Sequence, residues 1–264
     1  MVSDMSNAAG SVDLFGLAFS NGSGADVLKA ARASTAPGPR IIVTANVEHI
    51  VTLRDESAFR SAYAHAAVRT LDGMPLVWLA RLRGHRDARR VTGHDLLDAV
   101  FAEGAAASGR VYMLCASDEA GRILTRRFVA AGYPAAAVAF EVPPFGFERD
   151  EAYGRRLAAA IKEHGTTLLL MGVGAPKSEI WADRQGAALG EPVVLCIGEA
   201  LNVAAGLVPR APVLMQRLGL EWLFRFAGQP ARLFHRYFVR SWRFLVLAGL
   251  DRDLGPSLGK RSGA

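Results

Sequence analysis

The sequence contains little cysteine, and it lacks any long hydrophobic run. Two cysteines, Cys115 and Cys196, occur among 264 residues, each within an apolar stretch. A disulfide framework is therefore excluded, and both thiols are expected in the core. The best apolar run, Phe244 to Leu250, is far shorter than the roughly 18 residues that a membrane-spanning helix needs. The first ten residues also lack the basic flank and apolar stretch of a signal peptide, so we expect a cytoplasmic protein.

Metal-ligand spacing is missing as well. The six histidines show no regular spacing with cysteines or acids, so no zinc site is predicted. Asp251-Arg252-Asp253 has the Asp-x-Asp form that many nucleotide-sugar enzymes use for a divalent ion. It lies in a Gly/Pro-rich tail, however, and not at the end of a predicted strand. We expect neither a metal ion nor a cofactor.

What is abundant is apolar sequence, together with a basic C-terminal part. Hydrophobic residues make up 51% of the chain and charged residues 21%, which allows a large core and excludes disorder. The net charge is +6, yet the part from Arg210 onward carries ten basic and three acidic residues, so the rest is nearly neutral. This distribution indicates that an anionic partner meets the C-terminal part.

Short apolar runs alternate with segments of helical period, which predicts an α/β fold: an open, mostly parallel Rossmann-like sheet with helices on both faces. Strands are expected at Arg40 to Thr44, Val68 to Leu71, Arg110 to Cys115, Val138 to Val142, Thr167 to Gly172 and Pro192 to Ile197. Helices are expected at Ala25 to Ala33, Ser57 to Ala66, Pro75 to Leu82, Gly93 to Ala107, Glu119 to Ala131, Asp150 to His164 and Lys177 to Leu189, with Asp118 as a cap.

The alternation stops near Arg210, which divides the chain into four segments. We expect an N-terminal segment (1–39), an α/β catalytic core (40–209), a helical basic appendage (210–250) and a flexible tail (251–264). Leu214 to Phe226 and Pro230 to Leu250 are predicted helices of the appendage. Association of the chain with a second copy of itself stays open.

The appendage includes an amphipathic segment, Ala231 to Leu247. On a helical wheel at 100° per residue, its four arginines gather on one side and its aromatic and aliphatic residues on the other. The pattern fits a helix in an anionic membrane interface, with Trp242 and Tyr237 at headgroup depth. The alternative, a helix that packs its apolar face on the protein's own core or on another subunit, has nearly equal weight. Nucleic acid is not expected, because the aromatics are not interleaved on a basic surface.

Polar residues follow two predicted strands at their carboxyl ends, where ligands of open α/β sheets bind. Asp72 has the position of a general base, and Thr44 and Asn46 offer a hydroxyl and an amide to a sugar or phosphate. The alternative for each is helix capping. From the residues alone, capping is favoured about two to one for Asp72 and is at least as strong for Thr44 and Asn46.

Three further segments have the chemistry of a phosphate or sugar site. Arg90-Val91-Thr92-Gly93 opens a helix and suits a diphosphate. The alternative, in which Thr92 is an ordinary N-cap and Arg90 is solvated, has equal weight. The glycine-rich exit Gly172 to Glu179 lacks the third glycine of a nicotinamide fingerprint. The last segment is either a turn over a ligand or a link into the appendage, and its candidate residues are Gly198, Asn202 and Arg210.

Taken in this order, the motifs resemble the WecG/TagA/CpsF family of bacterial glycosyltransferases from about Arg40 to Tyr237. The resemblance rests on six ordered groups: Val43 to Asn46 with His49; Leu71 to Met74; Arg90 to Gly93 with Asp95 to Leu97; Gly172 to Lys177 with Glu179; Ala205-Gly206 with Arg210 to Pro212; and Gly219 to Trp222 with Pro230 to Arg232 and Arg236-Tyr237. It implies inverting transfer of a hexose or N-acetylhexosamine from a UDP-sugar to a sugar on a polyprenyl diphosphate. This reaction takes place at the cytoplasmic membrane face, in cell-surface polysaccharide or exopolysaccharide synthesis.

The resemblance also implies roles for individual residues. It makes Asp72 the general base, with Thr44, Asn46 and Arg90 as further catalytic residues. The implied substrate-binding residues are Thr92, Gly93, Gly172, Gly174, Pro176, Lys177, Ser178, Glu179, Gly198, Asn202 and Arg210. Ser178 stands where the family usually has Gln, and Asn202 where it often has Asp. These departures leave an N-acetylmannosamine-type donor and glucose both open.

Two other functions compete with this one. A nucleotide-dependent oxidoreductase on a similar sheet needs a complete glycine fingerprint, which the sequence lacks. A non-catalytic membrane-surface adaptor needs only the basic amphipathic segment, and it leaves the polar strand ends unexplained.

Overall fold

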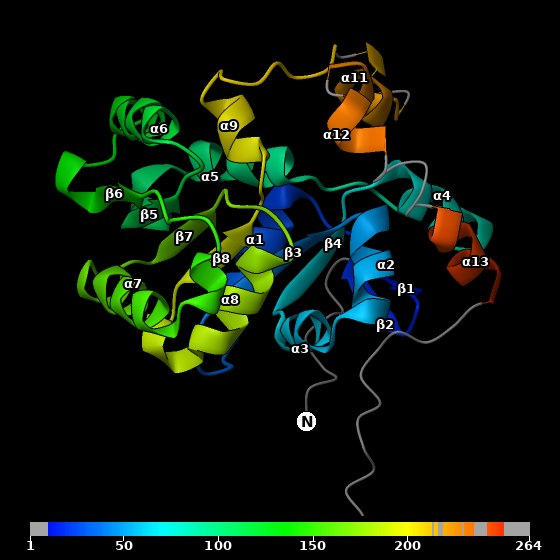
Figure 1. Cartoon of the computed structure of the whole chain (residues 1–264), viewed down its shortest axis with the longest axis horizontal. Coiled ribbons are helices and arrows are strands. Elements are labelled where there is room, and N and C mark those ends of the chain that lie inside the picture. The colour runs from blue at the N-terminus through cyan, green and yellow to red at the C-terminus, as the bar shows by residue number, and fades with distance from the viewer. Residues whose placement is uncertain (1–9, 213, 216–218, 229, 235–241, 251–264) are drawn as a thin grey trace, which may run out of the picture.

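A central sheet organises the molecule. The computed structural model describes residues 10–212, 214–215, 219–228, 230–234 and 242–250. Within them, eight strands form one sheet in the order β1-β2-β4-β3-β8-β7-β5-β6, parallel throughout except between β1 and β2 (Figure 1). The predicted α/β class is confirmed. The strands are β1 (Ser11–Leu14), β2 (Leu17–Ser20), β3 (Arg40–Ala45), β4 (Val68–Leu71), β5 (Val111–Leu114), β6 (Val138–Glu141), β7 (Leu168–Met171) and β8 (Val193–Cys196).

All six predicted strands, β3 to β8, are present within a residue or two of their expected bounds. Strands β5, β7 and β8 are buried along their whole length, as expected of parallel strands covered on both faces. Cys115 and Cys196 are free thiols and buried at this sheet, as predicted.

An N-terminal hairpin, β1 and β2, was not predicted. Its strands alternate buried and less buried residues, and they add an antiparallel edge beside β4. The two-residue turn between them has positive φ at both Phe15 (56°) and Gly16 (70°). A phenylalanine rarely adopts this backbone conformation, so the usual turn signal of a hairpin is weak here.

Helices cover both faces of the sheet, and the helices predicted up to Leu189 are confirmed. Two helices were not predicted: α2, which starts directly after β3, and the short α9, which follows β8. One correction concerns α6, whose cap is Ser117 and not Asp118. The predicted helix Lys177 to Leu189 ends as a 3₁₀ turn, Gly186–Leu189. The helices up to residue 204 are α1 (Gly24–Ala33), α2 (Val47–Asp55), α3 (Ser57–His65), α4 (Met74–Leu82), α5 (Gly93–Ser108), α6 (Asp118–Ala130), α7 (Glu151–Glu163), α8 (Lys177–Gln185) and α9 (Ala200–Ala204).

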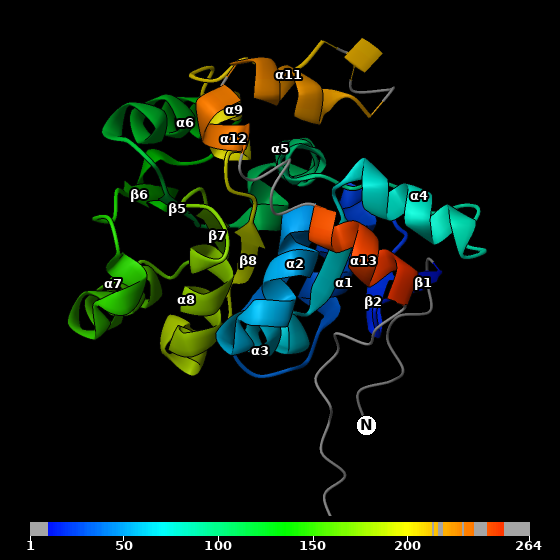
Figure 2. The ribbon, with the colours of Figure 1, turned by 45° about the vertical axis from the view of Figure 1, so that its right-hand side comes forward.

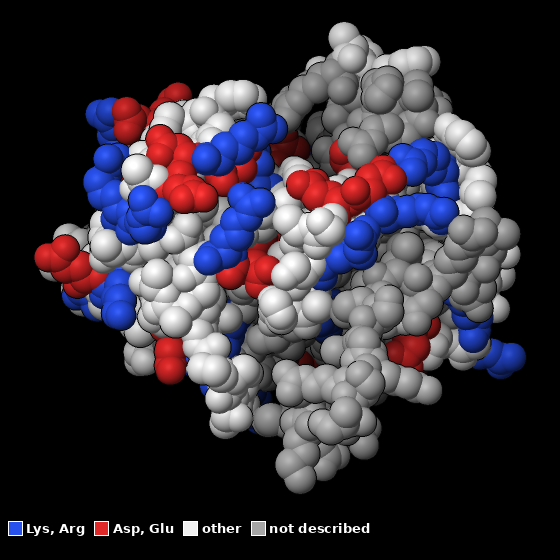
Figure 3. Space-filling model, turned by 60° about the horizontal axis from the view of Figure 1, so that its bottom comes forward, with Lys and Arg blue, Asp and Glu red and all other residues white. Residues whose placement is uncertain are grey.

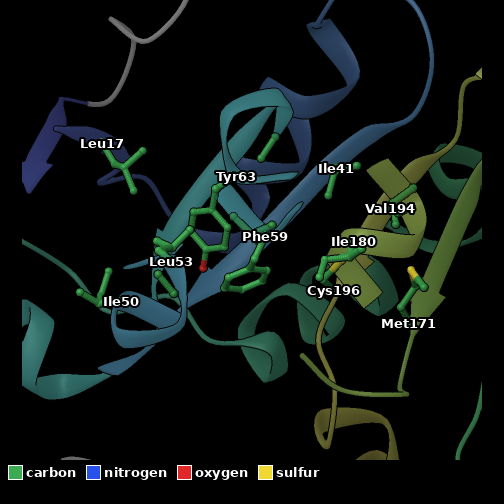
Figure 4. Close-up of a cluster of buried hydrophobic side chains, with 14 of the residues drawn as sticks. Leu17, Ile41, Ile50, Leu53, Phe59, Tyr63, Met171, Ile180, Val194 and Cys196 are labelled. Atoms are coloured by element: carbon green, nitrogen blue, oxygen red, sulfur yellow. The ribbon is translucent and has the colours of Figure 1, made fainter. Parts of the chain in front are cut away.

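The core consists of two layers separated by the sheet. Alternate residues of β3 show this, because Val43 packs in the layer of α2, α3, α7 and α8, whereas Ile42 packs in the layer of α1, α5, α6 and α9. Figure 4 shows part of the first layer, in which the rings of Phe59 and Tyr63 from α3 lie near Leu53 of α2.

Downstream of residue 204 the structure describes α11 (Glu221–Gly228), α12 (Pro230–Phe234) and α13 (Trp242–Leu250). The helix predicted over Leu214 to Phe226 is wrong in extent, because Gly219 has φ +71° and α11 begins after it. Of the predicted helix Pro230 to Leu250, residues 235–241 lie outside the described part, and so does the predicted tail 251–264. The four-segment division stays a prediction.

Helix α13 packs on the protein through one of its sides. Phe244 and Leu247 are buried, and the Phe244 ring meets that of Phe15 edge-on at 6.2 Å between centroids. Arg243 donates two hydrogen bonds to the Asp55 carboxylate of α2, at 2.7 and 2.8 Å. The packing alternative therefore holds for this side of the helix. Figure 2 shows α13 beside α2 and α4.

Candidate functional site

One cavity lies at the carboxyl ends of the parallel strands. Its volume is ≈ 1420 Å³, and it is lined from the ends of β3, β4, β5, β7 and β8. The chain leaves β3 toward the layer of α2, but it leaves β8 toward the layer of α9. Between two such strands an open α/β sheet has a crevice in which ligands bind.

The structure brings together all but one of the residues singled out from the sequence. The exception is Arg210, which is not among the cavity-lining residues and lies 3.9 Å from the Asp98 carboxylate of α5. The predicted residues that line the cavity are Thr44, Asn46, Asp72, Arg90, Thr92, Gly93, Gly172, Gly174, Pro176, Lys177, Ser178, Glu179, Gly198 and Asn202.

Asp72 sits on the turn between β4 and α4. Its own N–H and that of Gly73 both donate to the carbonyl of Ala45 on β3, at 2.8 and 3.3 Å, which fixes the turn beside the neighbouring strand. The N-cap of α4 is Gly73, which has no side chain with which to form a capping bond. Asp72 therefore lies one residue before the N-cap position of α4, at the cavity wall.

Thr44 and Asn46 take part in local structure as well as in the cavity wall. The Thr44 hydroxyl donates to the carbonyl of Cys196, which links the ends of β3 and β8 at 3.3 Å. Asn46 is the N-cap of α2, and its side-chain oxygen accepts a bond from the His49 N–H at 3.1 Å. The capping alternative is thus confirmed for Asn46. The same residue also lines the cavity.

Arg90 and Thr92 precede α5 and have different partners. Thr92 is the N-cap, in a reciprocal capping box with Asp95. Arg90 is not solvated as the alternative assumed, because its Nη2 lies 2.6 Å from the Glu221 carboxylate of α11. This ion pair holds α11 over the cavity, which Glu221 also lines.

The glycine-rich exit from β7 is shaped by close contacts. A side chain at Gly172 would approach Leu201 to 2.8 Å and the Leu114 carbonyl to 3.0 Å, so only glycine fits. Gly174 has φ +84°, and its carbonyl accepts a bond from the Ser178 hydroxyl at 3.1 Å. Ser178, the departure from the family pattern, therefore stabilises the turn that opens α8.

Glu179 is a buried carboxyl group at the cavity. It is 1% exposed, and its Oε2 has no hydrogen-bond partner among the residues that the structure describes. Burial raises the pKa of Glu179 to about 7. The Tyr63 hydroxyl lies 2.7 Å from Nδ1 of His49. The pKa of Tyr63 is raised mainly by burial and, to a smaller extent, by the nearby charge of Glu179.

Comparison with known proteins identifies the family. A model of the glycosyl transferase WecG/TagA/CpsF family matches residues 12–255. The chain belongs to this family. The protein is therefore a glycosyltransferase of polysaccharide biosynthesis and binds a sugar donor and an acceptor substrate. The match extends beyond the Arg40 to Tyr237 of the sequence resemblance, and it includes the hairpin that periodicity missed.

Some cavity residues of this glycosyltransferase were not singled out for a role. Glu221 occurs in the Gly219 to Trp222 motif, but nothing in the sequence pairs it with Arg90. Phe145 lies at the cavity rim, in the loop after β6. Spacing along the chain does not predict the pairing of Glu221 with Arg90, whereas Phe145 follows a predicted strand, at the end where ligands of such sheets bind.

Two features are absent from the part of the chain that the structure describes. No cluster of His, Cys, Asp and Glu that could hold a metal ion occurs in that part of the chain. None of the helices found there has the length and hydropathy needed to cross a bilayer.

Proposed function

We propose that the protein is an inverting glycosyltransferase that uses a UDP-sugar. It moves a hexose or N-acetylhexosamine, of the N-acetylmannosamine type or glucose, to a sugar on a polyprenyl diphosphate. The product enters cell-surface polysaccharide or exopolysaccharide. The observation that carries the proposal is the convergence of candidate residues from separate strand ends on one cavity, with Asp72 at its wall.

In this proposal Asp72 is the general base. A hydroxyl of the acceptor sugar attacks the anomeric carbon of the donor while the Asp72 carboxylate takes its proton. The bond between the anomeric carbon and the UDP oxygen breaks at the same time, so the configuration inverts and UDP leaves with the bonding electrons.

The leaving diphosphate needs positive charge. In the described part of the chain, Arg90 and Lys177 are the lysine or arginine side chains that line the cavity. A guanidinium has five N–H donors, and the bond from Arg90 to the Glu221 carboxylate uses only some of them. Arg90 therefore retains donors for phosphate oxygens. Lys177 begins α8, where backbone N–H groups and the helix dipole add to its charge.

The lipid acceptor also implies contact with a membrane. We infer a peripheral position at the cytoplasmic face of the cell membrane, supported by exposed apolar side chains on α4, α11, α12 and α13. On α13 the exposed side is opposite the packed one. The residues are Trp78, Leu82, Trp222, Leu223, Phe234, Trp242, Leu245 and Val246.

Charge alone does not carry the membrane proposal. Arg243, one of the four arginines of the predicted cationic stripe, pairs with Asp55. Arg236 and Arg240 lie outside the described residues. Figure 3 shows one face of the molecule, on which positive and negative side chains are interspersed.

Release of UDP tests the function. The protein is mixed with a set of UDP-sugars and a short-chain polyprenyl-diphosphate sugar, and UDP and glycolipid are measured with and without a chelator. We expect both products from one donor, without a requirement for a divalent ion. UDP formation without glycolipid, or no turnover of any donor, contradicts the proposal.

A further inference from the structure

Phe145 presents its ring to solvent at the rim of the cavity. The side chain is 100% exposed, in the loop between β6 and the 3₁₀ turn Phe147–Arg149. Pro143 and Pro144 restrict the backbone before it. After it, Gly146 adopts a left-handed conformation, and Phe147 is buried against Trp181 at 5.9 Å between ring centroids. The backbone is therefore restricted on both sides of Phe145, whose ring stays exposed.

A cation accompanies this ring. Nζ of Lys177 lies 5.3 Å from the centre of the Phe145 ring, in the geometry of a cation–π contact. Lys177 is also the first residue of α8, so the N-terminus of that helix lies near the Phe145 ring. An aromatic face beside a lysine and a helix N-terminus offers stacking to a nucleobase and positive charge to a phosphate.

The position in the sheet fits the far end of a nucleotide sugar. Asp72 follows β4, and Lys177 follows β7, three strands away in the order β4-β3-β8-β7. Three strand spacings make about 14 Å, a span that a nucleoside diphosphate can bridge. A donor with its sugar at Asp72 and its diphosphate along the strand ends therefore brings its base to Phe145.

We propose that Phe145 is the stacking platform for the nucleobase of the donor, with Lys177 beside it on the phosphate. This rests on the proposed function, because it assumes a nucleotide-sugar donor. A membrane contact is the weaker explanation of the exposed ring. The strand next to the loop, β6, is at the opposite edge of the sheet from β1, whereas α13 packs on the β1–β2 hairpin (Figure 1).

Binding measurements separate the base from the phosphates. Affinities for UDP and for inorganic diphosphate are measured by calorimetry with the unaltered full chain, Phe145→Ala and Phe145→Tyr. Val129→Ala, an exposed apolar site on α6 outside the cavity lining, is the matched control. Loss of one stacked base corresponds to a weakening of UDP binding by at least about fivefold. Diphosphate affinity should stay unchanged in Phe145→Ala, and Phe145→Tyr and Val129→Ala should bind UDP normally.

The outcomes distinguish the platform from the proposed function. Unchanged UDP affinity in Phe145→Ala, or an equal loss for UDP and diphosphate, overturns the platform while donor turnover by the unaltered protein sustains the function. Absence of any UDP binding and turnover by the unaltered protein overturns both. Normal UDP affinity in Phe145→Ala, with weaker flotation on vesicles that contain anionic lipid, assigns the ring to the membrane instead.

Discussion

Asp72 and Glu179 are carboxyl groups at one cavity, and they are expected to act differently. Asp72 follows a strand end, and the helix after it is capped by Gly73. Asp72→Asn keeps the side-chain shape but removes the base, so we expect kcat to fall at least about 100-fold. Turnover with the identified donor and acceptor is the measurement, with thermal unfolding as the control for the fold. Near-normal turnover of a folded variant would rule out general-base catalysis by Asp72.

Glu179 predicts a pH dependence of stability. Its pKa is raised from 4.5 to about 7 by burial, so the folded state keeps a proton that the unfolded chain loses. Stability from this group is therefore present below about pH 4.5 and is lost as the pH rises to 7, by up to about 3 kcal/mol. Glu179→Gln stays neutral, and its stability relative to the unaltered protein should increase across this window.

Denaturant unfolding at pH 5 and pH 7.5 checks this difference. The groups that face Glu179 are Tyr63 and Cys196, whose pKa values are raised by burial, so both stay neutral in this range; Asp72 and His49 lie near Tyr63. Glu163→Gln, at an exposed glutamate of α7, is the control and should follow the unaltered protein. A constant difference between Glu179→Gln and the unaltered protein would contradict a buried titrating carboxyl.

Sequence reasoning predicted the members of the cavity well, but not their contacts. Strand ends converge in a parallel sheet, so residues such as Asp72 and Thr44 could be placed there from their position alone. The pairing of Arg90 with Glu221 joins residues 131 positions apart and depends on how α11 folds back. Arg210 lies outside the cavity lining for a similar reason, because its position depends on the path of the chain after β8.

At the scale of elements, predictability followed the strength of local signals. Continuous apolar runs identified β3 to β8. Helix α2 was missed because it begins directly at the end of β3 and is rich in β-branched residues such as Val47, Ile50 and Val51. The β1–β2 hairpin was missed because Phe15 replaces the usual turn residue. The burial of Phe15 against Phe244 offsets the strain of its backbone.

Helix α13 predicts opposite effects from adjacent residues. Phe244 is buried against Phe15, whereas Leu245 is 70% exposed. Phe244→Ala should lower the free energy of unfolding by about 3–5 kcal/mol, the range for a large buried aromatic, and Leu245→Ala by less than about 0.5 kcal/mol. Denaturant unfolding measures both. Equal effects would mean that α13 does not dock on the hairpin.

At the scale of the molecule, the appendage connects the cavity to the exposed apolar surface. Glu221 of α11 pairs with Arg90, and Arg83, just after α4, donates to the Ala248 carbonyl of α13 at 2.8 Å. Helices on either side of residues 235–241 are thus fastened to the core. Removal of the appendage is therefore expected to change both membrane contact and structure, and a deletion alone does not separate the two.

The outward side of α13 provides the sharper test of membrane attachment. Trp242 is 57% exposed, Leu245 is 70% exposed, and Val246 is exposed on the same side of the helix. Their replacement by serine in one triple variant leaves Phe244, Leu247 and the Arg243–Asp55 pair intact. Burial of each such side chain contributes on the order of 1 kcal/mol. We therefore expect binding to anionic vesicles to fall at least about tenfold, with transfer to a long-chain lipid acceptor reduced and transfer to a short-chain acceptor unchanged.

Deletion of residues 231–264 should weaken vesicle binding further. Truncation before Arg210 should impair even transfer to the short-chain acceptor, because the truncated chain lacks Glu221, the partner of Arg90. Added salt should weaken attachment of the unaltered protein only in part, since salt screens charge but not apolar burial. Vesicle flotation and turnover of all three variants are the measurements, with unfolding curves to show that the triple variant is folded. If the folded triple variant floats as well as the unaltered protein, the exposed side of α13 does not touch the bilayer, and α13 acts only as a packed element of the core.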